Sequence, residues 1–179
     1  MTANRVKCFT FESVLAEDTS FRNSAAEPLD ATDTGLLGRL MVQGRATWAD
    51  LAVELDLTAP AIAQRVRRLE DRGIIRQFAA IVDPRVVAPV AAFVSVGGKP
   101  SDGRERMRKQ LTALESVQEC HFVGGADDHL LKVRCASIRD LEHLIAVTLP
   151  KVGAVVTGVR VVLSTVKETP VLPLPRNSV

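Results

Sequence analysis

The sequence of 179 residues has no long hydrophobic run, few cysteines and almost no net charge. Its longest apolar stretch, residues 86–94, is nine residues long and contains Pro89, far below the roughly 20 residues that cross a bilayer. The first thirty residues carry no basic start followed by an apolar block, so no secretory signal is expected. Three cysteines without a CxxC spacing exclude a disulfide framework. We therefore expect a cytoplasmic protein with free thiols and no membrane partner.

The sequence does contain enough hydrophobic side chains to form folded domains. Hydrophobic residues make up 46% of the chain and charged residues 25%, which excludes a wholly disordered protein. We predict an α+β protein with an N-terminal winged helix-turn-helix domain and a C-terminal ferredoxin-like βαββαβ domain. The expected division is a loose N-terminal extension (1–28), the winged helix-turn-helix domain (29–82), a linker (83–89), the βαββαβ domain (90–168) and a Pro-rich tail (169–179).

Three short helices with clear start and stop signals are predicted in the first domain. A capping residue precedes each of them, namely Asp30, Thr47 and Thr58. Leu36, Leu37, Leu40 and Met41 form the apolar stripe of the first helix, and Ile62, Val66 and Leu69 that of the third. Gly73 is expected to close the third helix. Residues 74–82 are rich in β-branched side chains and predict a strand that would supply the wing.

The second domain shows the element order β-α-β-β-α-β. The predicted strands are 90–96, 117–123, 129–135 and 155–166. The predicted helices are 101–115 and a second one that begins after Ser137 and ends before Pro150, with Ile138, Leu141, Leu144, Ile145 and Leu149 on its apolar side. This order over about eighty residues indicates a ferredoxin-like fold.

Alternation of side chains predicts the register of the central hairpin. If the turn centres between Ala126 and Asp127, Phe122 lies opposite Leu131 and Cys120 opposite Val133, on the helix-covered face. The other face then carries Glu119, His121, Lys132 and Arg134. The last strand is apolar on both faces, as in Val159, Val161 and Val162, and such a surface favours self-association.

The third helix carries an arginine-rich flank beside its buried stripe. At about 100° per residue, Ala61, Arg65, Arg68 and Arg72 lie together, with Gln64 next to them. In an isolated helix this would most simply be a solvated basic face. Here a capped helix and a tight turn precede it, which is typical of a helix-turn-helix whose second helix enters the major groove. Residues 29–80 hold seven Arg and seven Asp and Glu, so the positive charge is local to this helix.

The expected DNA contacts combine base reading with phosphate binding. Gln64 and the arginines reach base edges or phosphates, small residues allow close approach, Thr58 caps the reading helix, and Arg76 in the wing touches phosphate. The predicted DNA-binding residues are Thr47, Thr58, Ala59, Pro60, Ala61, Gln64, Arg65, Arg68, Arg72 and Arg76.

Several segments together resemble the Lrp/AsnC (feast/famine) family of prokaryotic transcription regulators. The matching segments are residues 29–33, 44–47 and 57–75, then Asp83-Pro84, Gly125-Ala126-Asp127-Asp128 and 157–167. The resemblance covers about residues 29–170 and is most specific in the reading helix. It implies binding to double-stranded DNA, dimers that assemble further into an octamer of four dimers, and free amino acids as effectors. It also implies control of amino-acid metabolism, with alanine dehydrogenase expression as one target.

The turn at residues 124–128 is the predicted effector site. Its glycines can offer N–H groups to a carboxylate and its aspartates can accept an ammonium, which suits a zwitterionic amino acid. A plain hairpin turn would show the same residue types, and the family resemblance favours the effector site. The predicted effector-binding residues are Val123, Gly124, Gly125, Ala126, Asp127, Asp128 and Thr157. Hydroxyls common in the family are missing at positions 124 and 159, which favours apolar or aromatic effector side chains.

Two other classes of protein are weighed against this interpretation. Cys120, His121, His129 and Cys135 contain the residue types of a metal site or a nucleophile pair, but Cys120 and His121 point to opposite faces of one strand. We expect no metal, no cofactor besides an amino-acid effector, and no catalytic residues. A ferredoxin-like enzyme or a small-molecule sensor without DNA binding remains the alternative, and binding to duplex DNA separates it from a transcription regulator.

Overall fold

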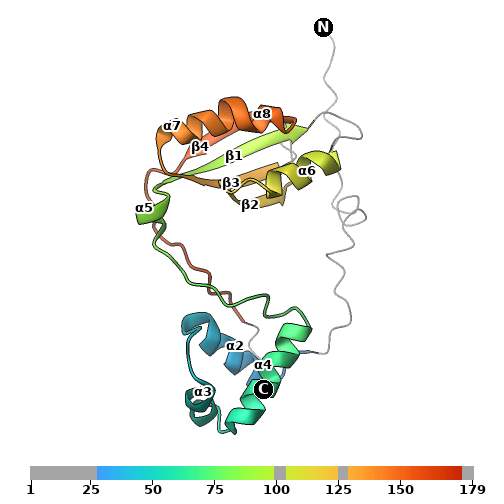
Figure 1. Ribbon diagram of the computed structural model, residues 1–179, viewed down its shortest axis with the longest axis vertical. Coiled ribbons are helices and arrows are strands. Elements are labelled where there is room, and N and C mark those ends of the chain that lie inside the picture. Colours follow the sequence, from blue (N-terminus) through green and yellow to red (C-terminus); the bar gives the residue numbers. More distant parts are fainter. Residues whose placement is uncertain (1–27, 99–103, 125–128, 175–179) are drawn as a thin grey trace. The chain divides into compact units, whose positions relative to one another are not determined.

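The computed structural model describes residues 28–98, 104–124 and 129–174, and their contacts divide them into two units. The helix-turn-helix unit contains residues 28–81 and 166–174, and the sheet unit contains the described residues between 82 and 165 (Figure 1). The domain boundaries predicted at residues 82, 90 and 168 stay predictions. In these described ranges, no helix combines the length and apolarity that crossing a membrane requires.

The helix-turn-helix unit consists of three helices, each with the predicted cap. They are α2 (Ala31–Val42), α3 (Trp48–Glu54) and α4 (Ala59–Asp71). Asp30 accepts a hydrogen bond from the Asp33 amide at 2.6 Å. Thr47 and Asp50 form a reciprocal capping box. The three caps set where each helix begins, so the helix starts were predictable locally.

One small hydrophobic core holds the three helices together. Its buried residues are Leu36, Leu37, Leu40, Leu51, Ala52, Ile62, Val66 and Leu69. The predicted stripe of the third helix and Leu36, Leu37 and Leu40 of the first lie in this core, whereas Met41, predicted on the first stripe, is half-buried and does not belong to it. The C-terminal tail joins the same core, because the partly buried side chain of Leu174 packs against it.

The reading helix ends as predicted, but the wing strand does not form. Gly73 has φ of 67°, and Ile74 donates its amide N–H to the Leu69 carbonyl at 2.9 Å, which completes a Schellman cap. Residues 74–82 are described without strand structure, and most of them are exposed. The prediction of a strand at 74–82 is therefore wrong for this chain. A strand needs a hydrogen-bonded neighbour, and the described part of the chain supplies none beside this segment.

A four-stranded antiparallel sheet forms the second unit. The strands are β1 (Val90–Gly98), β2 (Val117–Phe122), β3 (His129–Cys135) and β4 (Ala154–Val161). Their order in the sheet is β2-β3-β1-β4. With helices between β1 and β2 and between β3 and β4, this order confirms the ferredoxin-like fold.

All the helices that follow β1 cover one face of the sheet (Figure 1). They are α6 (Arg104–Thr112), α7 (Ile138–His143), the π-helical turn η2 (Leu144–Thr148) and α8 (Leu149–Lys151). The core beneath them includes Val94, Val96, Leu111, Leu131 and Leu149, all fully buried. The predicted start of the first of these helices, residues 101–103, lies outside the described residues.

Two details of the second long helix differ from the prediction. Ile138 is 61% exposed and does not join the apolar side, because it is the first residue after the Ser137 cap and precedes the part of the helix that covers the sheet. The helix also continues through Pro150 to Lys151. Proline lacks an N–H and clashes with the carbonyl four residues earlier in an α-helix, and the wider turn η2 just before it relieves this conflict.

The central hairpin has a different register from the predicted one. Cys120 pairs with Leu131 and Phe122 with His129, so each pair is displaced by two residues. A shift of two preserves the faces, and Glu119, His121 and Lys132 still share the side away from the helices. Alternation constrains only the face, whereas an irregularity between Val117 and Glu119 helps to set the pairing.

The last strand is shorter than predicted. The last residue pair of β4 joins Val161 to Ala92, and the Val162 amide still donates to the Ala91 carbonyl at 2.9 Å. Since β1 begins at Val90, it offers no partner to residues 164–166. Leu163 and Val166 are almost completely exposed. A register shift between Ser95 and Val96 places an extra residue, Thr157, in β4, and its hydroxyl donates to the Ser95 carbonyl at 3.1 Å.

The predicted linker holds a short helix. It is α5 (Pro84–Val87), and Asp83 caps it by accepting the Arg85 amide N–H at 2.9 Å. The Arg85 side chain also binds the Asp83 carboxylate, and together these bonds lower the pKa of Asp83 to about 2. Residues 83–89 are therefore structured next to the first strand of the sheet unit.

Candidate nucleic-acid interface

Helix α4 presents a polar face on the side opposite its buried stripe. Pro60, Gln64 and Arg67 are exposed, whereas Ile62, Val66 and Leu69 are buried. Among the predicted DNA-binding residues, the exposed ones are Thr47, Thr58, Pro60, Gln64, Arg68 and Arg76, and the half-buried ones are Ala59, Ala61, Arg65 and Arg72. Thr58 Oγ1 accepts the Ala61 amide N–H at 3.4 Å, so the predicted cap opens this helix.

The turn before α4 has the geometry of a helix-turn-helix. Asp56 has φ of 53°, a left-handed conformation that aspartate tolerates better than most residues. The Leu57 amide donates to the Ala52 carbonyl at 2.9 Å and so closes the end of α3. Four residues then separate α3 from α4. The tight turn predicted from the sequence is confirmed.

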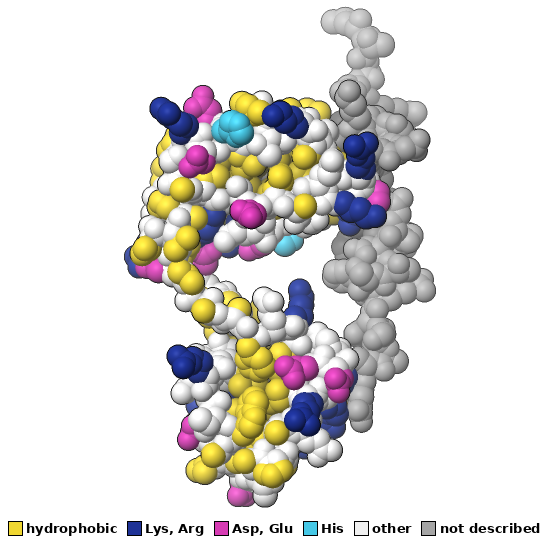
Figure 2. All heavy atoms as spheres, viewed as in Figure 1, with side chains coloured by type: hydrophobic (Ala, Val, Ile, Leu, Met, Phe, Trp, Pro, Cys, Tyr) yellow, Lys and Arg dark blue, Asp and Glu magenta, His cyan; other side chains and the backbone are white. Residues whose placement is uncertain are grey.

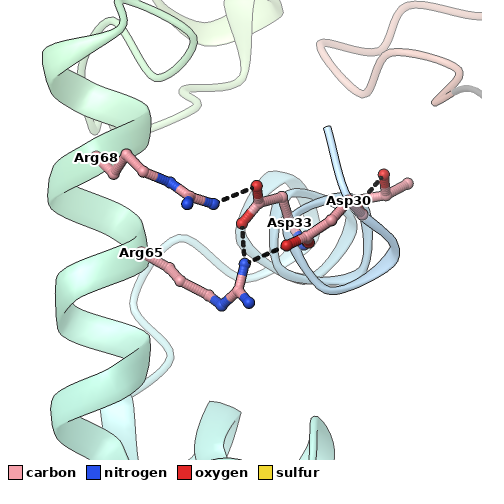
Figure 3. A network of polar contacts seen from close by, with 5 residues as sticks. Asp30, Asp33, Arg65 and Arg68 are labelled. Carbon is pink, nitrogen blue, oxygen red and sulfur yellow. Dashed lines mark hydrogen bonds and ion pairs between the residues drawn. The ribbon is translucent and has the colours of Figure 1, made fainter. Parts of the chain in front are cut away.

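Two arginines of α4 are bound to carboxylates of α2 (Figure 3). Arg65 Nη1 contacts Asp30 Oδ2 at 2.6 Å and Asp33 Oδ1 at 2.7 Å, and Arg68 Nη2 contacts Asp33 Oδ2 at 2.7 Å. Asp33 is only 1% exposed. That Arg65 and Arg68 contact DNA stays a prediction; the structure adds that both already hold anionic partners.

These contacts shift the pKa values of Asp30 and Arg65. The Asp33 amide N–H lowers the pKa of Asp30 most, Arg65 and Arg68 lower it further, and partial burial opposes the change. The carboxylates of Asp30 and Asp33 raise the pKa of Arg65. The ion pair between Asp30 and Arg65 therefore favours the charged forms of these two side chains.

Asp33 has a role beyond helix capping that was not predicted from the sequence. The sequence does contain an indication of this role. Asp33 precedes Leu36, Leu37 and Leu40 at helical spacing and so lies on the buried stripe of α2. A carboxylate at such a position requires a cation or several hydrogen-bond donors. Arg65 borders the buried stripe of α4, which is the place from which such a cation can reach it.

The helix-turn-helix unit does not carry charge of a single sign on its visible face. Figure 2 shows hydrophobic side chains through the middle of this face, with both basic and acidic side chains beside them. This distribution agrees with the equal numbers of basic and acidic residues in 29–80. Any electrostatic attraction to DNA therefore arises from local groups rather than from the unit as a whole.

The predicted effector site is only partly within the described residues. Gly125, Ala126, Asp127 and Asp128 lie outside them, so the predicted contacts of the turn stay predictions. Val123 is half-buried and Gly124 is exposed at the end of β2. Thr157 lies on β4, where its hydroxyl is engaged with β1.

The sheet face away from the helices carries a polar cluster. Glu119 accepts hydrogen bonds from Lys132 Nζ and interacts with His121 Nε2, both at 3.0 Å, and these contacts lower the pKa of Glu119. Cys120 and Cys135 carry free thiols, and burial raises the pKa of each. Across the described part of the chain, no three or more His, Cys, Asp and Glu side chains gather in a way that could hold a metal ion.

A helix-turn-helix unit joined to a ferredoxin-like sheet defines a DNA-binding regulator with a separate sensing domain. Residues 29–70 match the AsnC-type helix-turn-helix domain, and residues 91–172 match the Lrp/AsnC ligand binding domain. The chain belongs to the Lrp/AsnC family of transcription regulators.

Relatives and solved structures agree with this assignment. The leucine-responsive regulatory protein of Haemophilus influenzae is 37% identical over 158 residues, which cover 86% of this chain and 93% of that protein. The regulator LrpA of Mycobacterium tuberculosis is 36% identical over 66% of this chain and 80% of its own. A Neisseria meningitidis transcriptional regulator solved with L-Met has a TM-score of 0.74 and 29% identity, covering 82% of this chain and 97% of that one.

Proposed function

We propose that this transcription regulator reads its operator with the exposed face of α4. Gln64 reaches base edges, while Pro60, Ala59 and Ala61 let the helix approach the groove closely. Thr47, Thr58, Arg72 and Arg76 complete the contact surface through the DNA backbone. The observation that supports this most is the capped reading helix whose outer face is exposed and polar.

Replacement of Gln64 tests the reading face. If Gln64 contacts a base, Gln64→Ala lowers the preference for operator over random duplex DNA by about 1–3 kcal/mol. Gln118→Ala, an exposed glutamine on β2, is the matched control and leaves the preference unchanged. Fluorescence anisotropy with a duplex selected for binding to the wild-type protein measures both. A Gln64→Ala protein with unchanged preference would place base reading elsewhere.

An amino acid is the proposed effector, and it binds at or beside the turn of residues 124–128. The homologues include leucine-responsive proteins, and one similar structure is an L-Met complex. The ligand carboxylate would accept hydrogen bonds from the N–H groups of Gly124 and Gly125. The ligand ammonium would donate hydrogen bonds to Asp127 or Asp128. Val123, Ala126 and Thr157 would border the side chain, and apolar or aromatic side chains are expected to fit.

Calorimetry with leucine, methionine, phenylalanine and alanine tests the effector site. Asp128→Ala removes a proposed ammonium partner and Gly125→Thr crowds the backbone, so each weakens binding, by about tenfold or more for a charge-assisted hydrogen bond. Arg139→Ala, exposed on α7, is a control that keeps the wild-type affinity. If both turn variants bind these amino acids with unchanged affinity, the effector site lies elsewhere.

We further propose a homodimer that assembles into an octamer of four dimers. The sheet unit exposes Phe93 beyond the helix-covered core, and Val155, Val159 and Val161 on the edge strand β4, which is the kind of apolar surface that a second copy covers. Light scattering at micromolar concentration measures the mass. A monomer would refute the dimer, and a stable dimer would refute only the octamer.

Other parts of the proposed function follow from the family. We propose that the protein is not an enzyme, acts in the cytoplasm and controls genes of amino-acid metabolism, with alanine dehydrogenase as one predicted target. Failure of the purified protein to bind any duplex DNA at moderate salt would instead favour a small-molecule sensor or enzyme built on the ferredoxin-like fold.

A further inference from the structure

The contacts between α2 and α4 give Arg65 and Arg68 a role that differs from DNA contact. Each oxygen of the Asp33 carboxylate is taken by a different arginine, Oδ1 by Arg65 and Oδ2 by Arg68, both at 2.7 Å. Asp33 is 1% exposed, so in the folded protein its carboxylate depends on these two arginines rather than on water. Removing the arginines would leave a buried carboxylate without its cations, which is strongly unfavourable.

The geometry of this contact fixes one helix on the other. Arg65 and Arg68 are three residues apart, so they leave the same side of α4 in successive turns and converge on one residue of α2 (Figure 3). A two-point attachment restricts both rotation of α4 about its axis and sliding along it. Arg65 Nη1 also binds Asp30, the cap of α2, so the start of α2 belongs to the same network.

The formal charges of the network cancel, because it contains two arginines and two aspartates. Arg65 is also the less exposed of the two arginines, with 27% of its side chain accessible. Compensated charges contribute little to phosphate neutralisation. Arg67 is exposed on the outer face of α4, where it can approach DNA.

We propose that Arg65 and Arg68 are positioning residues, which hold the reading face of α4 at a fixed orientation through Asp33 instead of contacting DNA. This inference rests on the proposed reading function of α4. It replaces the expectation that Arg65 and Arg68 bind DNA, and it makes Asp33 a determinant of operator recognition although Asp33 is buried.

The sign of the effect of Asp33→Asn separates the two roles. If Asp33 positions α4, its loss weakens operator binding, by about tenfold as for a charged hydrogen bond. If Arg65 and Arg68 bind phosphate, loss of the competing carboxylate frees them and operator binding becomes stronger. Anisotropy with an operator duplex selected on the wild-type protein, and with a random duplex, measures this change.

The salt dependence of operator binding is an independent test, because a structural role of Arg65 and Arg68 leaves its slope unchanged. Each lost phosphate contact reduces the slope of log K against log salt by about 0.9. Arg65→Gln and Arg68→Gln are expected to weaken operator binding with an unchanged slope, whereas Arg67→Gln reduces it. A reduced slope in the Arg65 and Arg68 variants, or tighter binding by Asp33→Asn, would overturn the proposal.

Arg68→Lys keeps the test decisive if Asp33→Asn does not fold. Lysine retains the charge, binds phosphate well, and lacks the planar guanidinium that reaches Asp33 in this geometry. A positioning role predicts about tenfold weaker operator binding, and a phosphate contact predicts nearly normal binding. Circular dichroism confirms the fold of each variant. If the wild-type protein itself binds no duplex, the proposed function fails, and that outcome is distinct from an altered pattern among the variants.

Discussion

At the scale of single residues, the capping box of α3 is the simplest determinant of local stability. Thr47 Oγ1 accepts the Asp50 amide N–H at 3.1 Å, and Asp50 returns a contact to the Thr47 amide. We expect Thr47→Ala to lower the free energy of unfolding by about 1 kcal/mol. Thr47→Ser retains the hydroxyl and should lose much less. Urea denaturation followed by circular dichroism measures both, and equal losses would mean that the methyl group matters instead.

The titration of Asp30 predicts a dependence of stability on pH. Its pKa lies below the ordinary 3.8 in the folded protein, so the unfolded chain binds more protons in this range. The stabilisation is complete well above pH 3.8 and is lost as the pH falls through the lower folded value. Because half of the Asp30 side chain is exposed, we expect a loss below about 1 kcal/mol.

Asp30→Asn isolates this contribution, because asparagine caps helices well but does not titrate. Unfolding free energies at pH 7 and pH 3 should differ less in Asp30→Asn than in the wild type. An identical pH dependence in the two proteins would show that Asp30 does not contribute.

At the scale of elements, the end of α4 depends on Gly73. Its φ of 67° is unfavourable for residues with a Cβ, and no neighbouring atom within 4 Å would obstruct one. We therefore expect Gly73→Ala to cost about 1 kcal/mol through backbone conformation alone. Gly44→Ala is the matched control, because its φ is not positive and the nearest contact of its Cβ would be an ordinary 3.6 Å. Chemical denaturation measures the loss of unfolding free energy in both variants. A loss only in Gly73→Ala supports the conformational cause, and equal losses would contradict it.

The C-terminal tail is an element of the helix-turn-helix unit, although the sheet unit precedes it in the sequence. Leu174 packs on the core of that unit, close to Gly38 of α2. We expect Leu174→Asp to lower the unfolding free energy by about 1 kcal/mol, since only part of its surface is buried. Leu172→Asp, at a mostly exposed position, should have little effect. Equal effects on thermal unfolding would contradict the packing of Leu174.

At the scale of the whole molecule, two separate hydrophobic cores lie in two units. Leu36 belongs to one and Leu131 to the other, and both are fully buried. We expect Leu36→Ala and Leu131→Ala each to cost about 2–5 kcal/mol. Differential scanning calorimetry should show that each variant shifts the unfolding of its own unit more than that of the other. Identical thermograms for the two variants would mean that the units unfold as one.

What the sequence determined by itself was the set of features that arise within one element. Helix starts follow from the side chains of Asp30, Thr47 and Thr58, and the end of α4 from Gly73, because caps act over three or four residues. Hydrophobic periodicity likewise determined which faces are buried and which order of elements forms the ferredoxin-like sheet.

Only the tertiary structure decided features that depend on a distant partner. Residues 74–82 have strand-like composition, but the described residues provide no neighbouring strand for them. The last residue pair of β4 with β1 joins Val161 to Ala92. The hairpin register could shift by two residues without moving any side chain to the other face. Helical spacing places Arg65 and Arg68 on one flank, and the position of Asp33 on a buried stripe indicates that it needs a cation. Which cations reach Asp33, more than thirty residues away in the sequence, is decided only by the packing of α2 against α4.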